Sequence, residues 1–506
     1  MQIRLAEVVA SLALATDLAT GQPLESSLRR ALLAVWLGEK LGFSEDDLST
    51  IYYVALLGSV GCILDGAAFA DFVPDEIAVR EKMVTLDPSK PLRVAAFFTT
   101  QAGAGDPPLK RLGKLFWLSR QSQAVCRDVA LQVGDLLDLG PSIREALGQC
   151  DEHWNGKGPV LGLKGEEIHL AARLFILCHD VEVFNRVGGY DAALKVVKER
   201  ANRLYDPQIA SCFEAAGAGL LNRLQSEPAW DSVLAIEPAP VRSITGDEFD
   251  EVGRRVADFV DMRSPFTVGH SSAVASLSAA TARELGLPIG GQTLLRHAGL
   301  LHDLGRCGVP ASFWNKPDQL LQTEWERMKG HPSATELVLA RSSSLGHLGT
   351  LGGLHHEHLD GSGYRGIGAA SLPVTARILA AVDTYQTKLE PRPYRPALAP
   401  GQAAEELSER VLAGKLDSDV VTAVLAAAGH RREIPAVPLP AGLSEREVEV
   451  LRLAVQGLTN RQIADLLVVS PKTVGHHIEN IYTKTGVSTR VGATLFALSH
   501  GLIHAE

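Results

Sequence analysis

The stretch HAGLLHDLGRCGVP, residues 297–310, places a histidine and an aspartate, His302 and Asp303, next to each other at the end of an apolar helical segment. Consecutive side chains of a helix point in different directions, so the two can serve one site only if the bound group lies near the helix end. A lone histidine–aspartate pair is weak evidence of function. The residues around it decide whether it belongs to a site.

Histidines concentrate around this pair. Eight of the sixteen fall between residues 270 and 358: His270, His297, His302, His331, His347, His355, His356 and His358. Asp383 ends a further apolar helix, ARILAAVD. A single histidine is most often a hydrogen-bonded core or surface residue, but imidazole is also the commonest transition-metal ligand, and carboxylates complete such sites. The ordered set of histidines and aspartates therefore predicts a metal centre.

Composition sets the scale of the molecule and excludes some classes. The chain has 506 residues, 46% hydrophobic and 21% charged, with a formal net charge of −10, so any nucleic-acid binding must be local. No apolar stretch reaches the roughly 18–20 residues of a membrane helix. The cysteines form no CxxC pair, which argues against a disulfide framework or a thiolate zinc site. We expect a cytoplasmic protein without a membrane partner.

An internal repeat organises most of the chain. Residues 26–43 lie over 270–287 at an offset of 244, as do 55–62 over 299–306, and 150–158 lie over 355–363 at an offset of 205. Apolar residues at three- and four-residue spacing dominate, and strand patterns are scarce. With the proline-rich segments as boundaries, we predict an all-α protein: helical bundles at 1–235 and 241–430, a linker at 431–442, and a small domain at 443–506.

Residues 241–430 resemble the HD-GYP branch of the HD phosphohydrolases. The resemblance rests on HSSAVA at 270, HDLGRCGVP at 302, EWERMKGHP ending at 332, HHEHLDGSGYRG at 355 and AVDTYQTKLEPRPYR ending at 395. It implies an HD-type helical bundle with iron or manganese ions, and many members hydrolyse cyclic di-GMP. The metal ligands implied by position are His270, His302, Asp303, His331, His355, His356 and Asp383.

The resemblance also implies roles for neighbouring residues. Two metal ions can activate a water and stabilise a phosphodiester without a protein nucleophile. Asp303, as a bridging ligand, and Arg306 are the predicted catalytic residues. Substrate contacts are predicted for Gly361, Gly363, Tyr364, Arg392 and Arg395. A tight turn for the glycines and surface ion pairs for the arginines are the alternatives.

Three positions depart from the family's pattern. Arg365 stands where the family has a proline, Arg306 where it has a lysine, and Phe266 where members with three metal ions carry a carboxylate. We therefore expect two divalent metal ions, and a phosphoester other than cyclic di-GMP stays open as the substrate.

The first copy lacks the ligand set. The positions matching His270, His302, Asp303, His355 and His356 hold Ser26, Gly58, Ser59, Cys150 and Asp151. Glycine and serine do not anchor a dinuclear metal site. We predict a helical fold without catalysis, whose role is dimerisation, regulation or packing.

Two capped helices are predicted near the C-terminus. Thr459 with Gln462 forms a capping box for a helix over 460–468, and Ser470 with Pro471 begins a second one. From Leu443 to Ala493 the segment resembles the LuxR-type helix-turn-helix, a four-helix domain that reads the major groove with its third helix and dimerises through its fourth. The DNA contacts implied by position are Arg461, Lys472, Thr473, Val474, His477, Asn480, Lys484 and Arg490.

The sequence thus predicts a homodimeric, DNA-binding transcription regulator with an HD-GYP-like phosphohydrolase domain. Its expected partners are double-stranded operator DNA and a cyclic dinucleotide such as cyclic di-GMP, which the domain hydrolyses or senses. Two alternatives stay open. One is an enzyme that acts mainly on another phosphoester. The other is a metal-containing ligand sensor without turnover.

Overall fold

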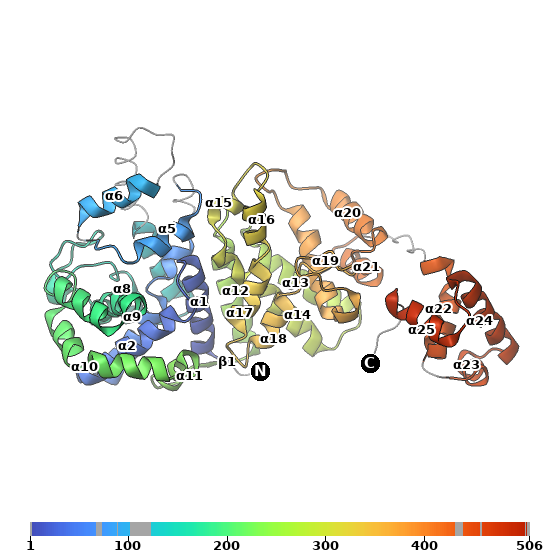
Figure 1. The fold of residues 1–506 in the computed structure, drawn as a ribbon, viewed down its shortest axis with the longest axis horizontal. Helices are drawn as coiled ribbons and strands as arrows, with labels where there is room; N and C mark the ends of the chain where they lie inside the picture. The colour runs from blue at the N-terminus through green and yellow to red at the C-terminus, as the bar shows by residue number, and fades with distance from the viewer. Residues whose placement is uncertain are drawn as a thin grey trace. The chain divides into compact units, whose positions relative to one another are not determined.

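Helices make up nearly all of the regular structure (Figure 1), as the apolar spacing predicted. The computed structural model describes residues 3–66, 73–88, 90–101, 123–430, 439–455, 458–500 and 502. In this part of the chain, the strands β1 (Ile3–Arg4) and β2 (Ser243–Ile244) pair antiparallel, with Ile3 opposite Ile244. None of the helices that the structure describes has the length and apolar character needed to cross a lipid bilayer.

Two compact units make up the chain. The first unit consists of Met1–Ala279, Pro288–His355 and Gln386–Leu398. The second consists of Ala280–Leu287, His356–Tyr385 and Ala399–Glu506. The boundary passes through helices α13 (His270–Glu284) and α19 (Val374–Leu389), so each of these helices contributes to both units.

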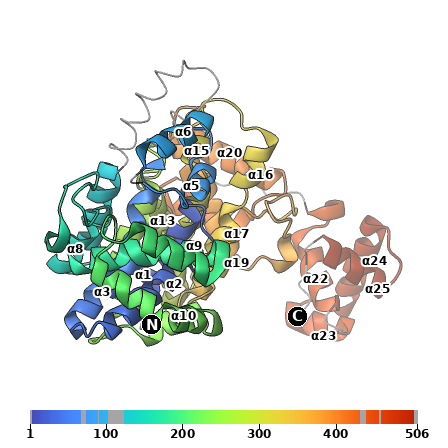
Figure 2. The same cartoon turned by 60° about the vertical axis from the view of Figure 1, so that its left-hand side comes forward.

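The N-terminal part of the first unit is a helical bundle. Its elements are α1 (Leu5–Ala19), α2 (Ser26–Lys40), α3 (Glu45–Leu57), η1 (Val60–Ile63), α5 (Glu76–Met83), α6 (Pro91–Gln101), α8 (Pro141–Leu147), η2 (Gly165–Glu167), α9 (Leu170–Arg200), α10 (Pro207–Ser226) and α11 (Ala229–Ala235). Helix α2 packs against α3, α9 and α10 (Figure 2) and buries Trp36. Helix α9 is interrupted at Gly189, because its φ angle of 71° is not helical. Glycine adopts this angle more readily than other residues do.

A second set of helices follows in the same unit and carries the histidine–aspartate pair. Its elements are α12 (Gly246–Asp261), α13, α14 (Ile289–Leu301), η3 (Leu304–Gly308), α15 (Ala311–Trp314), α16 (Gln322–Met328), α17 (His331–Leu339) and α18 (Gly346–Gly352). Two glycines bring these elements close together. A Cβ atom on Gly299 would lie 2.6 Å from the Ala275 Cα atom, and one on Gly305 would lie 2.5 Å from the Thr335 nitrogen. Helix α14 can therefore pack on α13, and η3 on α17.

The second unit contains η4 (Ala369–Ser371), most of α19, α20 (Pro400–Leu412) and α21 (Ser418–Ala427). It also contains the C-terminal elements η5 (Pro440–Gly442), α22 (Glu445–Val455), α23 (Asn460–Leu467), α24 (Pro471–Thr485) and α25 (Arg490–Ser499). These last helices enclose a small core that includes Val450, Ile463, Val474 and Ile481. The core forms because each amphipathic helix turns one apolar stripe toward the other helices.

The two copies of the repeat make the same hydrogen bonds at matching positions. Ser27 Oγ donates to Asp17 Oδ1 at 2.6 Å, and Ser271 Oγ donates to Asp261 Oδ1 at 2.8 Å. Both residues of the second pair lie 244 positions after those of the first. The offset that the sequence alignment used therefore also relates two buried contacts.

A loop in each copy repeats a second pattern. The Glu152 carboxylate accepts the backbone N–H groups of Leu161 and Leu163 at 2.7 and 3.0 Å. The Glu357 carboxylate accepts those of Arg365 and Ile367, both at 2.8 Å. Gly156 and Gly361, four residues after each glutamate, both have positive φ angles, of 74° and 75°. The DGSG segment is therefore a tight turn organised by Glu357.

Candidate metal centre and nucleic-acid interface

Five of the seven predicted metal ligands lie together in the first unit, near the ends of helices. His270 and His331 begin α13 and α17, His302 follows the last residue of α14, and Asp303 precedes η3. His355 comes three residues after α18. All five residues are at most 1% exposed. Helix ends from four segments thus deliver the polar side chains into one buried space.

The four histidines converge on the Asp303 carboxylate. His302 Nε2 lies 3.1 Å and His270 Nε2 3.5 Å from Asp303 Oδ2. His331 Nε2 lies 3.3 Å and His355 Nε2 3.5 Å from Asp303 Oδ1. Asp303 is therefore at the centre of the cluster, with histidines on both of its oxygens.

The other ring nitrogen of each histidine lies against an acceptor. The Nδ1 atoms of His302, His331 and His355 lie 2.6–2.7 Å from the carbonyl oxygens of Gly299, Met328 and Gly352, each three residues earlier in the chain. His270 Nδ1 lies 3.0 Å from Glu390 Oε1. A carbonyl oxygen accepts only, so the proton of a neutral imidazole stays on Nδ1 and the Nε2 lone pair points into the cluster.

This arrangement fits a metal ion. The Nε2 atoms of His331 and His355 lie 3.1 Å apart, and with protons on both Nδ1 atoms neither Nε2 can donate to the other. A shared cation removes the repulsion between the two lone pairs. Histidine ligands of metals characteristically donate the second ring N–H to a carbonyl or carboxylate, as each histidine does here.

Arg306 lies beside the cluster and its guanidinium contacts Asp303. Arg306 Nη2 is 2.8 Å from Asp303 Oδ2, and the guanidinium carbon lies 4.6 Å from the centre of the Trp314 ring. Burial alone would raise the pKa of the Asp303 carboxyl, but Arg306 and His302 outweigh it and hold that pKa well below its ordinary value. Asp303 is therefore a carboxylate, as a bridging metal ligand must be.

The two remaining predicted ligands lie in the second unit and face each other. His356 Nδ1 is 3.5 Å from Asp383 Oδ2, and the His356 ring lies 4.4 Å, centre to centre, from the Tyr364 ring. His356 directly follows His355 in the chain. The metal roles of all seven residues stay predictions, and the geometry within each unit is compatible with them.

The arginines among the predicted substrate contacts form hydrogen bonds within the protein. Arg395 donates to the carbonyl oxygens of Thr387, Lys388 and Glu390 at 2.6–3.3 Å, and thereby caps the C-terminal end of α19. Arg392 donates to the Phe266 carbonyl at 2.6 Å and to Glu390 at 2.9 Å. Both arginines thus have intramolecular partners, and their contacts with phosphate stay predictions, as do those of Gly361, Gly363 and Tyr364.

Glu390 is a residue that the sequence interpretation missed. Its carboxylate lies against His270, and burial, opposed by the hydrogen bond to His270, leaves the pKa of Glu390 below its ordinary value. The sequence signal that could have identified Glu390 is its spacing from Asp383. Glu390 follows Asp383 by seven residues, the length of two helical turns, and comes directly after the last residue of α19.

In the first copy, the side chains of Arg30 and Phe175 lie beside the residues that match the metal-ligand positions of the second copy. Arg30 Nε donates to the Ala55 carbonyl at 2.7 Å, and Ala55 matches Gly299 at the offset of 244. Arg30 Nη1 lies 3.3 Å from the hydroxyl of Ser59, which matches Asp303. A Cβ atom on Gly58 would lie 2.6 Å from a Phe175 ring carbon. In the first copy, Arg30 and Phe175 thus lie beside the positions that match His302 and Asp303.

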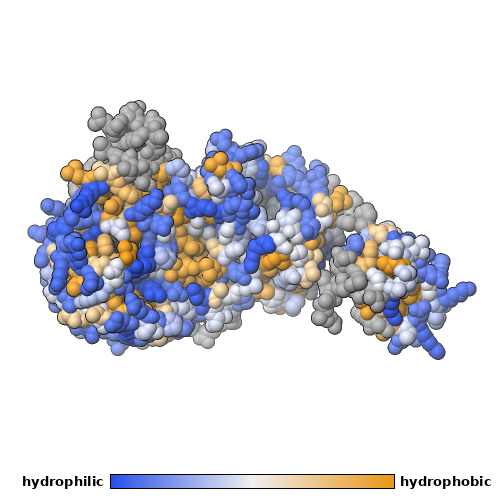
Figure 3. Space-filling model, viewed as in Figure 1, coloured by the Kyte–Doolittle hydropathy of each residue, from blue (hydrophilic) through white to orange (hydrophobic). Residues whose placement is uncertain are grey.

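The C-terminal helices form the predicted helix-turn-helix. Thr459 accepts the Gln462 N–H, and Gln462 Oε1 accepts the Thr459 N–H at 2.8 Å, which confirms the capping box before α23. Ser470 accepts the Thr473 N–H at 3.1 Å, and Pro471 is the first residue of α24. Hydrophilic surface covers much of the outer part of this domain in Figure 3.

Helix α24 presents several of the predicted DNA contacts to solvent. Lys472 and Thr473 are exposed at its first turn, as is Arg461 on α23, and His477 and Asn480 are half-buried further along α24. The structure does not support the predicted DNA contact of Val474. Its side chain is fully buried in the core of the domain, so it has no surface to offer to DNA.

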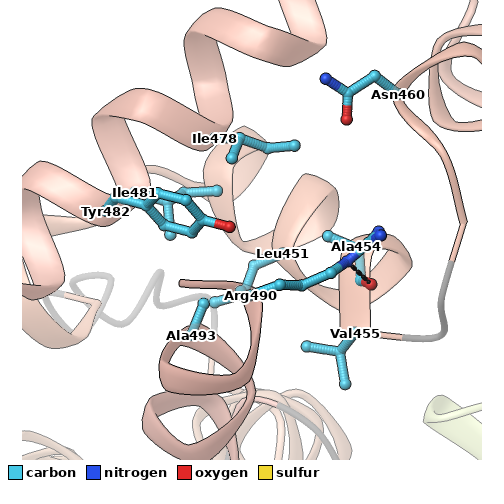
Figure 4. Close-up of a pocket in the computed structure, with 9 residues that line it drawn as sticks. All are labelled: Leu451, Ala454, Val455, Asn460, Ile478, Ile481, Tyr482, Arg490 and Ala493. Atoms are coloured by element: carbon cyan, nitrogen blue, oxygen red, sulfur yellow. Dashed lines mark hydrogen bonds between the residues drawn. The ribbon is translucent and has the colours of Figure 1, made fainter. Parts of the chain in front are cut away.

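The side chains of the last two predicted DNA-contacting residues, Lys484 and Arg490, contact other residues of the same domain. Lys484 Nζ lies 2.7 Å from Glu447 Oε2. Arg490 Nε donates to the Ala454 carbonyl at 2.7 Å, along one side of a cavity of about 140 Å³ that Ile478 and Tyr482 also line (Figure 4). These two cations have structural partners, and their contacts with phosphate stay predictions.

Two families match the chain. Residues 254–420 match the HD domain, and residues 441–497 match the bacterial regulatory proteins of the luxR family. The chain therefore contains a region that matches the HD domain and, after it, a region that matches the LuxR-family helix-turn-helix.

Several named proteins are similar to the chain. The chain is 27% identical over 419 residues to the 3'3'-cGAMP-specific phosphodiesterase 3 of Vibrio cholerae, covering 80% of this chain and 91% of that protein. It is 34% identical over 186 residues to a cyclic di-GMP phosphodiesterase of Thermotoga maritima, covering 35% of this chain and 50% of that one. The crystal structure of the cyclic GMP-AMP specific phosphodiesterase V-cGAP3 of V. cholerae has the same fold, with a TM-score of 0.60 at 23% identity, over 85% of this chain and 98% of that one.

Proposed function

We propose that the protein is a DNA-binding regulator whose HD domain hydrolyses a cyclic dinucleotide with the help of divalent metal ions. The observation that carries this proposal is the convergence of four histidine Nε2 atoms on Asp303, each histidine having its Nδ1 atom against an acceptor. The named activities of the relatives make 3'3'-cGAMP and cyclic di-GMP the substrates to test first.

In this proposal, each group of residues has a separate role. Two iron or manganese ions, held by His270, His302, Asp303, His331, His355, His356 and Asp383, would supply Lewis acidity toward the phosphodiester and its attacking water. Glu390 and the backbone carbonyls orient the imidazoles and keep their protons on Nδ1. Arg306 adds a fixed positive charge beside Asp303, where negative charge on the phosphate needs stabilisation.

The rest of the chain fits a regulator. We propose that residues 1–235 are a second, degenerate HD bundle, because the Asp17–Ser27 and Asp261–Ser271 hydrogen bonds recur at one offset. Residues 443–506 would bind double-stranded operator DNA through α24, as a homodimer on two half-sites. Nucleotide binding and DNA binding would then be linked within one chain.

The test is turnover by protein purified without oxygen, reduced, and loaded with iron or manganese. We expect hydrolysis of 3'3'-cGAMP, cyclic di-GMP or both, and its loss in Asp303→Ala. The matched control is Asp318→Ala, because Asp318 is an exposed aspartate of the same HD domain that lies outside the cluster. Metal-loaded protein that hydrolyses neither nucleotide would contradict the enzymatic proposal.

One observation favours a second candidate, a metal-containing sensor without turnover. The Arg306 guanidinium contacts Asp303 Oδ2 at 2.8 Å, and a cation at that oxygen competes with a bridging metal ion. A sensor would bind the cyclic dinucleotide tightly and leave it intact. Equilibrium dialysis followed by chromatography of the recovered nucleotide separates the two candidates.

A further inference from the structure

Two cysteines that are far apart in sequence meet in the first copy. Cys62 Sγ and Cys126 Sγ lie 3.8 Å apart, although 64 residues separate them. Cys126 Sγ is also 3.2 Å from Asp65 Oδ2. The sequence argued against a thiolate metal site because it contains no CxxC pair, but the fold assembles such a group from residues on η1, the turn after it and the helical residues 123–136.

The spacing of the donor atoms matches tetrahedral coordination. With metal–sulfur bonds of about 2.3 Å, two sulfur ligands of a tetrahedral zinc ion lie about 3.8 Å apart. One ligand atom from each of Cys62, Asp65 and Cys126 lies within 4.8 Å of the other two. Three protein ligands with one position left for water or another donor is an established zinc arrangement.

The surrounding structure holds the three residues in place. Arg80 forms an ion pair with Asp65 Oδ1, and its Nη1 atom donates to the Cys62 carbonyl at 2.7 Å. A Cβ atom on Gly61 would lie 2.5 Å from the Cys126 Cα atom, so glycine there lets the two segments touch. Asp65 is only 2% exposed. The site is therefore built by packing, and it does not depend on mobile surface side chains.

The charges of the group call for a divalent cation once the thiols ionise. Two thiolates and the Asp65 carboxylate carry three negative charges, and Arg80 supplies one positive charge, which leaves a net charge of −2. Hydrogen bonding to Cys62, followed by burial, raises the pKa of the Cys126 thiol well above its ordinary value. Without a cation the Cys126 thiol therefore keeps its proton, and a divalent ion coordinated by both sulfurs and by Asp65 offsets the negative charge of the group.

We propose that Cys62, Asp65 and Cys126 form a binding site for a thiolate-preferring divalent cation of the zinc class, separate from the histidine–aspartate cluster. Binding releases the two thiol protons to solvent and forms two metal–sulfur bonds and one metal–oxygen bond. The site lies in a turn whose Ile63 carbonyl accepts a hydrogen bond from Arg263 at 2.6 Å. Occupancy thus stiffens the contact between the first copy and the HD domain.

The test uses the full chain, reduced with a phosphine, freed of metal and titrated with Co²⁺. Sulfur ligands give cobalt an intense charge-transfer absorption in the near ultraviolet, which histidine and carboxylate ligands do not give. We expect this band to reach, at saturation, the intensity of one thiolate-bound cobalt per chain, whatever cobalt the histidine–aspartate cluster also takes up, and to disappear on adding Zn²⁺. The protein with Asp303→Ala should keep the band, so failure of the proposed phosphodiesterase function would leave this result unaffected.

Variants identify the ligands. Cys62→Ser and Cys126→Ser should each abolish the band, and Asp65→Asn should weaken cobalt binding about tenfold or more. Cys212→Ser, in α10 and outside the group, is the matched control and should change nothing. Wild-type protein without the band, or a band that persists in Cys62→Ser, contradicts the proposal. So does a Cys62–Cys126 disulfide in metal-free protein that resists the phosphine.

Discussion

Arg263 and Glu76 form a buried ion pair in which Arg263 Nη2 lies 2.9 Å from Glu76 Oε1, and the two side chains are 3% and 0% exposed. The same guanidinium donates to the carbonyl oxygens of Ile63 and Val309 at 2.6 and 2.8 Å. Glu76 Oε1 also accepts the Ala311 N–H at 2.8 Å. The pair therefore ties the first copy to the segments on either side of the HD motif.

Removing one member of this pair should destabilise the first unit. We expect Glu76→Gln to lower the free energy of unfolding by about 3 kcal/mol or more, because it leaves the Arg263 charge buried without a counter-charge. The double variant Glu76→Leu with Arg263→Met should recover part of the loss. Denaturant unfolding measures both, with Arg254→Met of the exposed pair Arg254–Asp258 as the control. Equal losses in Glu76→Gln and Arg254→Met would show that the buried pair is unimportant.

Glu390 should govern metal affinity through His270. We expect Glu390→Ala to weaken binding of iron or manganese about 10- to 100-fold, because the imidazole loses the acceptor that orients it. Glu390→Gln should have a smaller effect, since its amide oxygen still accepts the Nδ1 proton. Metal content after dialysis against graded chelator measures the change, and Glu409→Ala on the exposed face of α20 is the control. Unchanged retention in Glu390→Ala would remove Glu390 from the site.

Asp17 should make stability depend on pH. Burial outweighs the Ser27 hydrogen bond and the Arg30 charge, and raises the pKa of Asp17 from 3.8 to about 7. Between pH 4 and 7 the folded chain therefore holds a proton that the unfolded chain has lost. The free energy of unfolding should fall with rising pH by at most about 1.4 kcal/mol per unit from this group. Asp17→Asn should remove that slope, measured by denaturant unfolding at pH 5 and 7. Parallel pH profiles for the two proteins would rule out the raised pKa.

Lys472 should contribute a phosphate contact. It is exposed at the first turn of α24. We expect Lys472→Ala to weaken binding to specific and non-specific duplexes alike, and to reduce the slope of log K against log salt by about 0.9. Fluorescence anisotropy at several salt concentrations measures the slope. Lys195→Ala, at an exposed position of α9, is the control. An unchanged slope in Lys472→Ala would place this lysine outside the DNA interface.

The turn between α23 and α24 contains local strain at Val468. This residue adopts φ 54° and ψ 48°, a left-handed conformation that disfavours β-branched side chains, and its side chain is 90% exposed. We expect Val468→Asn to stabilise the domain by about 1 kcal/mol, because asparagine tolerates this conformation and no packing is lost. Slower hydrogen exchange of the α23 and α24 amides is the readout. Faster exchange in the variant would show that Val468 contributes packing.

Local signals made the helix-turn-helix predictable. The Thr459 and Gln462 capping box and the Ser470–Pro471 start depend on residues within three positions of one another, so they can be read from the sequence. Val474 shows the limit of a positional comparison. The resemblance placed it at the DNA, whereas the structure buries it in the core of the domain.

The sequence by itself determined the helical class, the repeat, the histidine–aspartate set and the capped helices, because periodicity, spacing and caps act over short stretches of chain. Only the tertiary structure decided which distant groups meet. It placed Glu390 against His270, Arg263 against Glu76, and Cys62 against Cys126, pairs separated by 120, 187 and 64 residues. Such contacts depend on how whole helices pack, and burial, which sets the strength of the charges involved, exists only after that packing.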